Sequence, residues 1–240
     1  MRRIDELLVA LDVNTGAQAL ELATALDGIA GGFKIGSRLF TLEGPQLVRT
    51  LSARGARVFL DLKFHDIPNT VAQAVESAVQ TGAWMINVHA SGGMAMMAAA
   101  ARAARNTSSR LRCPVPLMIG VTVLTSMDQQ ALRGVGVERP ILEQVIALAR
   151  LTQQAGLDGV VASAQETPEI RKACGPEFQI VTPGIRGASA GTERNDQSRT
   201  MGPAEAIDAG ANYIVVGRPI IAAPDPAAAA REIARELRGE

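Results

Sequence analysis

The sequence predicts a single domain, residues 1–240, folded as a closed (β/α)8 barrel with parallel strands. Short runs of aliphatic and β-branched residues alternate with Ala- and Leu-rich segments of helical spacing, eight times in strict order. Such alternation implies parallel strands joined by right-handed helical crossovers. Eight units in 240 residues suit a closed barrel. No break in composition marks a linker, and an open doubly wound sheet is the alternative architecture.

The predicted strands are short and apolar. Strands of a parallel α/β sheet are covered on both faces, so they read as continuous apolar runs. In chain order they are 7–12 (LLVALD), 32–36 (GFKIG), 57–63 (RVFLDLK), 84–89 (WMINVH), 116–123 (PLMIGVTV), 158–162 (DGVVA), 179–183 (QIVTP) and 213–217 (YIVVG).

The predicted helices fill the intervals between these strands. The last of them is the best marked, because Asp225 and Pro226 form a cap and first-turn pair in front of it. The helices are expected at 16–28, 44–54, 70–81, 92–105, 138–155, 166–173, 203–209 and 225–238.

The composition narrows the possible functions. The formal net charge is zero, with 24 basic and 24 acidic residues, so no positive excess indicates nucleic acid or an anionic membrane as a partner. Aromatic residues make up 3%, which disfavours base stacking. Cys113 and Cys174 fit two reduced thiols of a cytoplasmic protein. The N-terminal MRRIDELLVALDV lacks the apolar run of a signal peptide, and no stretch reaches the ~20 apolar residues of a membrane span.

The third predicted strand carries two charges where an apolar sequence is expected. Asp61 and Lys63 lie within VFLDLKF, and charge inside a covered strand is costly unless it is paired. The two residues share parity, so their side chains point the same way. Both fall at the carboxyl end of the strand, which is the end that carries the active site in barrels. A buried salt bridge or a solvated strand end is the alternative interpretation.

Polar and ionisable residues follow other strands at the same end. A ring of opposed charges in a dry pocket is the arrangement expected of a catalytic site. Simpler readings remain open for three residues: His89 as a hydrogen-bonded core histidine, His65 as a loop residue, and Asp66 as a helix cap. The ring comprises Asp12, Lys34, His89, Thr125, Ser126, Arg186, Gly217 and Arg218.

These residues belong to a pattern that covers the whole chain. "DLKFHDIPNTV" closely resembles the signature of the orotidine 5′-monophosphate decarboxylase family, whose reaction is the last step of pyrimidine nucleotide synthesis. Further blocks agree in order along the chain, which is more specific than one motif. They are "LVALDV", "FKIG", "NVHASGG", "GVTVLTSM", "VTPGIR" and "VVGRPI".

The resemblance implies a role for each matched residue. Lys63 is the proton donor to the pyrimidine carbon that loses carbon dioxide, Asp61 lies beside the substrate carboxylate, and Lys34 and Asp66 complete a chain of alternating charges. The family is dimeric, and Asp66, Ile67 and Thr70 are expected to reach into the neighbouring subunit's site. The remaining contacts are expected from Asp12 and Lys34 to the ribose, from Thr125, Ser126 and Pro183 to the substrate around the pyrimidine, and from Arg186, Gln197, Gly217 and Arg218 to the phosphate.

The chemistry of this reaction fits those residue types. Loss of carbon dioxide leaves an electron pair in the plane of the ring, where it is poorly delocalised. No cofactor or metal site is indicated by the sequence, so fixed electrostatics in a dry pocket are the expected means of stabilisation. Residues 185–200 form an aperiodic loop that is predicted to close as a lid on the phosphate.

Two other functions compete with this prediction. A related sugar-phosphate decarboxylase or aldolase would use magnesium and would need a further carboxylate near the end of the second strand. "FKIGSRLF" offers none before Glu43. A barrel that only binds nucleotides would show binding without turnover, and the cost of keeping Asp61, Lys63 and Asp66 together argues against it.

Overall fold

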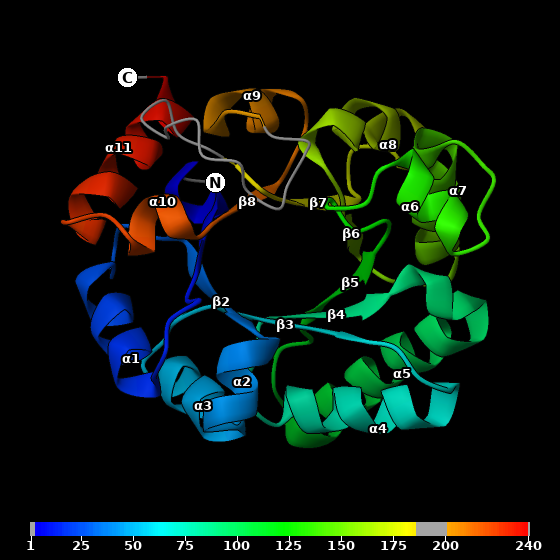
Figure 1. Cartoon of the computed structure of the whole chain (residues 1–240). Helices are drawn as coiled ribbons and strands as arrows, with labels where there is room; N and C mark the ends of the chain where they lie inside the picture. The colour runs from blue at the N-terminus through cyan, green and yellow to red at the C-terminus, as the bar shows by residue number, and fades with distance from the viewer. Residues whose placement is uncertain (1–2, 186–200, 240) are drawn as a thin grey trace.

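Eight parallel strands close into a barrel in which each strand neighbours the next one in the sequence. The structure is a computed structural model that describes residues 3–185 and 201–239. The strands follow one another around the barrel from β1 to β8, and β8 pairs with β1 to close it. Figure 1 shows the helices surrounding this ring. The predicted fold class is therefore confirmed, and the open sheet is excluded.

Every predicted strand is present, and several are shorter than predicted because the chain leaves the ladder before the apolar run ends. The third strand extends one residue further than expected, to Phe64. The observed strands are β1 Leu7–Ala10, β2 Gly32–Gly36, β3 Val58–Phe64, β4 Met85–His89, β5 Leu117–Val121, β6 Gly159–Val161, β7 Gln179–Pro183 and β8 Tyr213–Val216.

Each predicted helix is also found. The Asp225 side chain accepts the Ala228 N–H at the start of the last one, as the cap pair predicted. These helices are α1 Gly16–Ala25, α3 Pro45–Ala53, α4 Pro68–Val79, α5 Gly93–Leu111, α7 Ile141–Gln154, α8 Thr167–Cys174, α9 Pro203–Asp208 and α11 Pro226–Arg238. Within residues 3–185 and 201–239, no helix is long and apolar enough to cross a membrane.

Short helical segments were not predicted. Each has at most seven residues, so it presents too little periodicity to be read from sequence. They are the α-helices α2 Ser37–Glu43, α6 Gln129–Gly134 and α10 Arg218–Ile221, and the 3₁₀ segments η1 Arg3–Glu6, η2 Ala90–Gly92 and η3 Ala164–Glu166.

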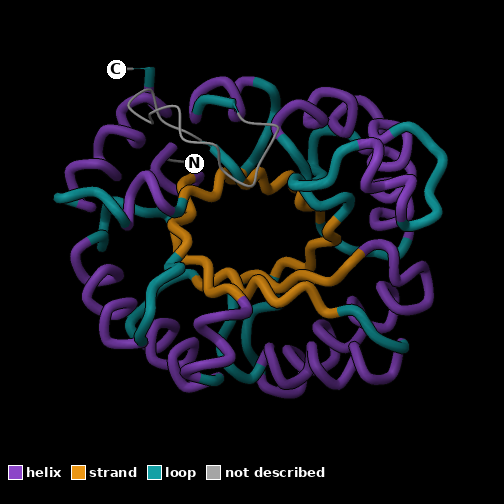
Figure 2. Tube along the Cα trace, viewed as in Figure 1, coloured by secondary structure: helices purple, strands orange, loops and turns teal. Residues whose placement is uncertain are grey.

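The strands have an apolar layer on each side. One side packs against the surrounding helices, and the other fills the barrel, where Phe59, Met85, Ile119 and Val181 meet in the centre. Figure 2 shows the ring of strands inside the ring of helices. Because these side chains fill the interior of the barrel, a pocket can form only at the carboxyl end of the strands.

Aromatic and charged side chains close the amino end of the barrel. The rings of Trp84 and Tyr213 meet edge to face with centroids 5.3 Å apart. The Arg57 guanidinium lies 4.7 Å from the centre of the Trp84 ring and donates to the backbone oxygens of Gly31 and Asp5. These contacts join the starts of several strands at the end remote from the charged residues.

Arg171, in the last turn of α8, connects two turns of the barrel wall. Its guanidinium joins the α8–β7 turn to the turn before β8, donating to the backbone oxygens of Gly175, Pro176, Phe178 and Gly210 and to the side-chain oxygen of Asn212. Hydrogen bonds from a charged donor are worth more than neutral ones, so these contacts are expected to stabilise the barrel wall.

We expect Arg171→Met to lower the free energy of unfolding by at least about 1.5–3 kcal/mol, the value of a charged hydrogen bond. Urea unfolding followed by Trp84 fluorescence measures the change. The matched control is Arg231→Met on the exposed side of α11, which should stay within about 0.5 kcal/mol of wild type. Equal stability of the two variants would show that the Arg171 contacts contribute nothing.

Candidate active site

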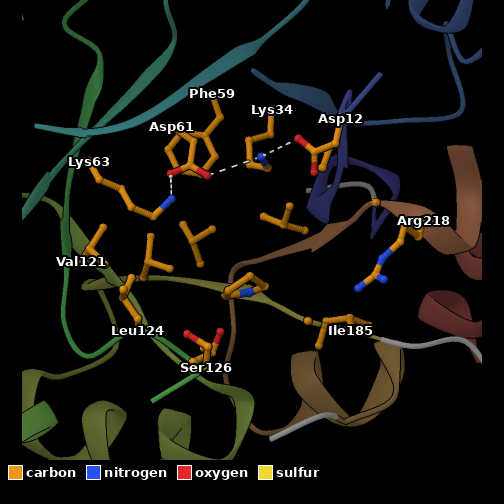
Figure 3. A pocket seen from close by; sticks show the side chains of 18 of the residues that line it. Asp12, Lys34, Phe59, Asp61, Lys63, Val121, Leu124, Ser126, Ile185 and Arg218 are labelled. Carbon is orange, nitrogen blue, oxygen red and sulfur yellow. Dashed lines mark hydrogen bonds and ion pairs between the residues drawn. The ribbon is translucent and has the colours of Figure 1, made fainter. Parts of the chain in front are cut away.

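A cavity of about 410 Å³ opens at the carboxyl end of the strands. That volume lies within the range of roughly 300–1,000 Å³ typical of small-molecule sites. Its floor and one wall are apolar, formed by Phe59, Val121, Val161, Val181 and Val215. Charged side chains from β2, from β3 and from the loop after β1 line the opposite wall (Figure 3). The cavity therefore combines an apolar lining with a cluster of charged side chains.

Four of the charged residues form a chain of alternating sign. The Lys63 ammonium lies 2.6 Å from Asp61 Oδ1, and the Lys34 ammonium lies 3.5 Å from Asp61 Oδ2 and 3.3 Å from Asp12 Oδ1. The dashed lines in Figure 3 trace this series. Asp61 is buried and Asp12 is exposed at the rim. These four of the charges predicted to gather at this end are therefore in direct contact.

The carboxylate of Asp61 is held in its ionised form. Burial alone would raise its pKa, but the nearby Lys34 and Lys63 ammoniums and the hydrogen bonds from Lys63 and Asn87 outweigh burial, so the pKa lies below its ordinary value. A charged Asp61 also keeps two ammonium groups close together that would otherwise repel each other. Asp61 is therefore the link between the two lysines.

Lys63 lies in an irregular part of β3, where side chains do not simply alternate between the two faces of the strand. Leu60 pairs with Ile86 and Phe64 with Val88, so β3 uses two more residues than β4 over the same interval. Lys63 has a φ of 51°, in the left-handed region that side-chain-bearing residues seldom adopt. The expectation that residues 61 and 63 face the same way is met, but through a bulge that bends the strand.

A site residue that the sequence reasoning missed is Asn87 in β4. It is fully buried and hydrogen-bonds to both Asp61 and Lys63. The available signal was the same one that identified Asp61, a polar residue inside a strand whose sequence is otherwise apolar. An uncharged amide in an apolar strand is a weaker sign of function than a charge, so the sequence alone does not single out Asn87.

The other half of the cavity is lined by residues at or just beyond the ends of β5, β7 and β8, which were predicted to contact the substrate. Arg218 lies across the cavity from Lys63 in Figure 3. It is the first residue of α10, whose N-cap is Gly217. This short helix, which was not predicted, begins at the rim of the cavity. The predicted residues that line this half are Thr125, Ser126, Pro183, Gly217 and Arg218.

Some predicted residues do not line the cavity of their own chain. Asp66, Ile67 and Thr70 are exposed at the start of α4, and the chain after β3 runs outward from the barrel to reach them (Figure 1). Asp66 Oδ1 accepts the N–H of Ile67, while the N-cap of α4 is Ile67 without a side-chain cap. Helix capping therefore does not explain Asp66. Arg186 and Gln197, and the predicted lid beyond Ile185, lie outside the described residues.

The two histidines of the sequence lie beside each other near Lys63. Their ring centroids are 5.4 Å apart. Burial lowers the pKa of His89, and the nearby His65 and Lys63 lower it further, against the opposite effect of Asp61. His89 is only half-buried, which differs from the core histidine allowed by the sequence. Neither ring lines the cavity described above.

Glu43 was the first carboxylate after the second strand, and it is used elsewhere. Its Oε1 accepts the N–H of Gly16 at 2.7 Å, at the start of α1. A side chain on Gly16 would collide with the same carboxylate. Within residues 3–185 and 201–239 there is no cluster of three His, Cys, Asp or Glu side chains suited to a metal ion. Glu43 therefore does not supply the extra carboxylate that the magnesium alternative requires.

The whole barrel is similar to known proteins. The family described as "Orotidine 5′-phosphate decarboxylase / HUMPS family" matches residues 5–233. Orotidine 5′-phosphate decarboxylase of Moorella thermoacetica is 56% identical over 99% of this chain and 94% of its own, and that of Pseudomonas putida strain GB-1 is 50% identical over 97% of both chains. The crystal structure of the Lactobacillus acidophilus enzyme of the same name covers 96% of this chain and 98% of its own, with 34% identity and a TM-score of 0.84.

Proposed function

The chain belongs to the orotidine 5′-phosphate decarboxylase / HUMPS family, and from this membership and its site we propose that it converts orotidine 5′-monophosphate to uridine 5′-monophosphate and carbon dioxide. The observation that carries the proposal is the contact series Asp12–Lys34–Asp61–Lys63 on one wall of a cavity whose floor and facing wall are apolar. Relatives that share half or more of the sequence carry the name of this enzyme.

The reaction needs a positive charge at one carbon atom of the pyrimidine. The bond between that carbon and the carboxylate breaks, carbon dioxide leaves, and the electron pair stays on the ring carbon. The Lys63 ammonium stabilises the developing negative charge and then transfers a proton to it, which leaves a neutral amine that water reprotonates. A lysine suits this task because its charge is compact and its proton can be released.

Asp61 has two parts in this proposal. In the empty site it accepts a hydrogen bond from the Lys63 ammonium and so fixes the direction of that group. With substrate bound it lies beside the carboxylate that must leave, and like charges in a site of low polarity repel. Repulsion that disappears as carbon dioxide departs favours the transition state over the bound substrate. Lys34 limits this repulsion, because its ammonium forms an ion pair with the other carboxylate oxygen of Asp61.

The phosphate is assigned to the side of the cavity opposite Lys63. Loops after the seventh and eighth strands of such barrels commonly bind phosphate, and Arg218 occupies that place. Gly217 permits close approach of the backbone there, and the resemblance adds Arg186 and Gln197 to the same group. Binding energy gained at the phosphate is then available to exclude water from the reacting carbon.

We expect Arg218→Ala to reduce kcat/KM for orotidine 5′-monophosphate by about ten- to 150-fold, which corresponds to the roughly 1.5–3 kcal/mol of a charged hydrogen bond. Turnover of orotidine, which lacks the phosphate, should change little. Steady-state assays of both substrates measure the difference, with exposed Arg49→Ala as the control. Equal losses for both substrates would remove the phosphate assignment.

We further propose that the active unit is a homodimer in which Asp66, Ile67 and Thr70 complete the partner's site. Ile67 is 66% exposed, which is unusual for an isoleucine. Among the ion pairs of the described residues, Asp66 makes none with a lysine of its own chain. A two-fold axis would place the same three residues of each subunit at the other subunit's cavity.

The proposed activity is tested by incubating the protein with orotidine 5′-monophosphate in excess chelator. Release of carbon dioxide together with uridine 5′-monophosphate, undiminished by the chelator, is the expected result. Turnover that stops in chelator and returns with magnesium would favour the related metal-dependent sugar-phosphate enzymes. Binding of the nucleotide without release of carbon dioxide would favour a non-catalytic barrel.

A further inference from the structure

Asn87 occupies a place in the barrel that ordinarily holds an apolar side chain. It lies in the middle of β4, between Ile86 and Val88, and none of its surface is exposed. It does not line the cavity, so it has no access to a bound substrate. Burying an amide is unfavourable unless its donors and acceptors are hydrogen-bonded. Its contacts therefore show what it contributes.

The amide joins the two parts of β3 that carry the charges. Asn87 Oδ1 accepts the backbone N–H of Lys63 at 2.8 Å, and Asn87 Nδ2 donates to Asp61 Oδ1 at 2.7 Å. The same Asp61 oxygen accepts the Lys63 ammonium at 2.6 Å. Backbone, ammonium, carboxylate and amide thus form a closed ring of hydrogen bonds around one lysine.

The bulge in β3 explains why an amide is needed there. Where β3 takes two more residues than β4, the regular ladder between the strands is interrupted. The backbone N–H of Lys63 then needs another acceptor, and Asn87 Oδ1 supplies it. Lys63 also has a φ of 51°, and a strained conformation of this kind persists only where surrounding contacts hold it.

We propose that Asn87 is a positioning residue, which holds Lys63 in its left-handed conformation and turns the Asp61 carboxylate toward the two lysines. It acts through these residues and does not touch the substrate. The inference rests on the proposed decarboxylation, in which the direction of the Lys63 ammonium decides the rate. A shift of about 1 Å in a reacting group lowers rates by roughly 10²-fold.

Two variants separate the two functions of the amide. Asn87→Ala removes both hydrogen bonds, and we expect kcat to fall by about 10²-fold, the cost of a misplaced reacting group. KM should change little because the phosphate contacts are untouched. Asn87→Asp keeps an acceptor for the Lys63 N–H but has no donor for Asp61 while it is ionised. It should be as impaired as the alanine variant at pH 8.

Acidification distinguishes positioning from a general loss of packing. Two adjacent carboxylates share a proton at raised pKa, and the protonated carboxyl group of the Asn87→Asp variant would donate to Asp61 as the amide does. The kcat of Asn87→Asp relative to wild type should therefore rise as the pH falls from 8 to 5.5, while that of Asn87→Ala stays low. Rates are counted per folded molecule, from circular dichroism at each pH.

The matched control is Thr182→Val in β7. Thr182 is also fully buried in a strand, and its hydroxyl has no hydrogen-bond partner among the described residues, so the isosteric change should leave kcat unaltered. Crystal structures of the variants give a readout independent of activity. In Asn87→Ala, the φ of Lys63 should leave the left-handed region.

The outcomes bear separately on the two proposals. If the wild-type protein does not decarboxylate orotidine 5′-monophosphate, the proposed function fails, and the crystal structures alone judge the positioning role. If wild type is active and Asn87→Ala keeps kcat within twofold, or keeps both the φ of Lys63 and its contact with Asp61, the positioning role is wrong. Parallel pH dependence of the alanine and aspartate variants would overturn it as well.

Discussion

Lys63→Ala protein should remain folded and lose nearly all turnover of orotidine 5′-monophosphate. Removing one electrostatic donor from a preorganised site costs about 10²–10³ in kcat. Lys63 is also the proposed proton source, so the loss should exceed that range. The phosphate side of the cavity stays intact in this variant, so binding of uridine 5′-monophosphate, measured by calorimetry, should persist and show that the site is formed.

The backbone of Lys63 requires a second variant. Alanine also removes the side-chain hydrogen bond to Asp61 that helps to hold the left-handed backbone of Lys63, so part of any loss in Lys63→Ala reflects movement of the bulge. Lys63→Gln keeps a long side chain with a donor for Asp61 but removes the charge and the transferable proton. Both variants should be inactive, whereas Lys172→Ala, an exposed lysine paired with Glu169, should match wild type. Near-normal turnover by folded Lys63→Gln protein would end the proposed role of Lys63.

The charged part of the site was readable from sequence because charge in a covered strand is costly. Asp61 and Lys63 stand out in an apolar run, and their position at the carboxyl end of β3 gives their location in the barrel. Lys34 and Asp12 follow by the same reasoning on neighbouring strands. Alternation of strands and helices was strong enough to give the closed barrel without any contact information.

The bulge that delivers Lys63 to the cavity was not readable. Left-handed backbone is usually announced by glycine or asparagine, and here it is adopted by a lysine. The compensating residue, Asn87, lies 24 positions away on another strand. Glu43 shows the same limit, because its partner is the start of α1 and its helix α2 is too short to be seen. Local patterns do not contain such long-range hydrogen bonds.

The dimer proposal gives the second large effect, which is recovery of activity from two inactive proteins. Lys63→Ala homodimers and Asp66→Asn homodimers should each be nearly inactive. Mixed in equal amounts under conditions that allow subunit exchange, about half of the dimers contain one subunit of each kind. One site of a mixed dimer then has both lesions. The other takes Lys63 from the Asp66→Asn subunit and Asp66 from the Lys63→Ala subunit, so it is complete.

Roughly a quarter of the wild-type activity should return on mixing, because one site in four is whole. The matched control pairs Lys63→Ala with Asp61→Asn. These two residues are in contact within one chain, so every site in their mixture keeps a lesion and no activity should return. Exchange itself is followed by native mass spectrometry of the two variants. If mixed dimers form and Asp66→Asn restores nothing to Lys63→Ala, then Asp66 serves its own subunit, and its exposed position beyond β3 would need another explanation.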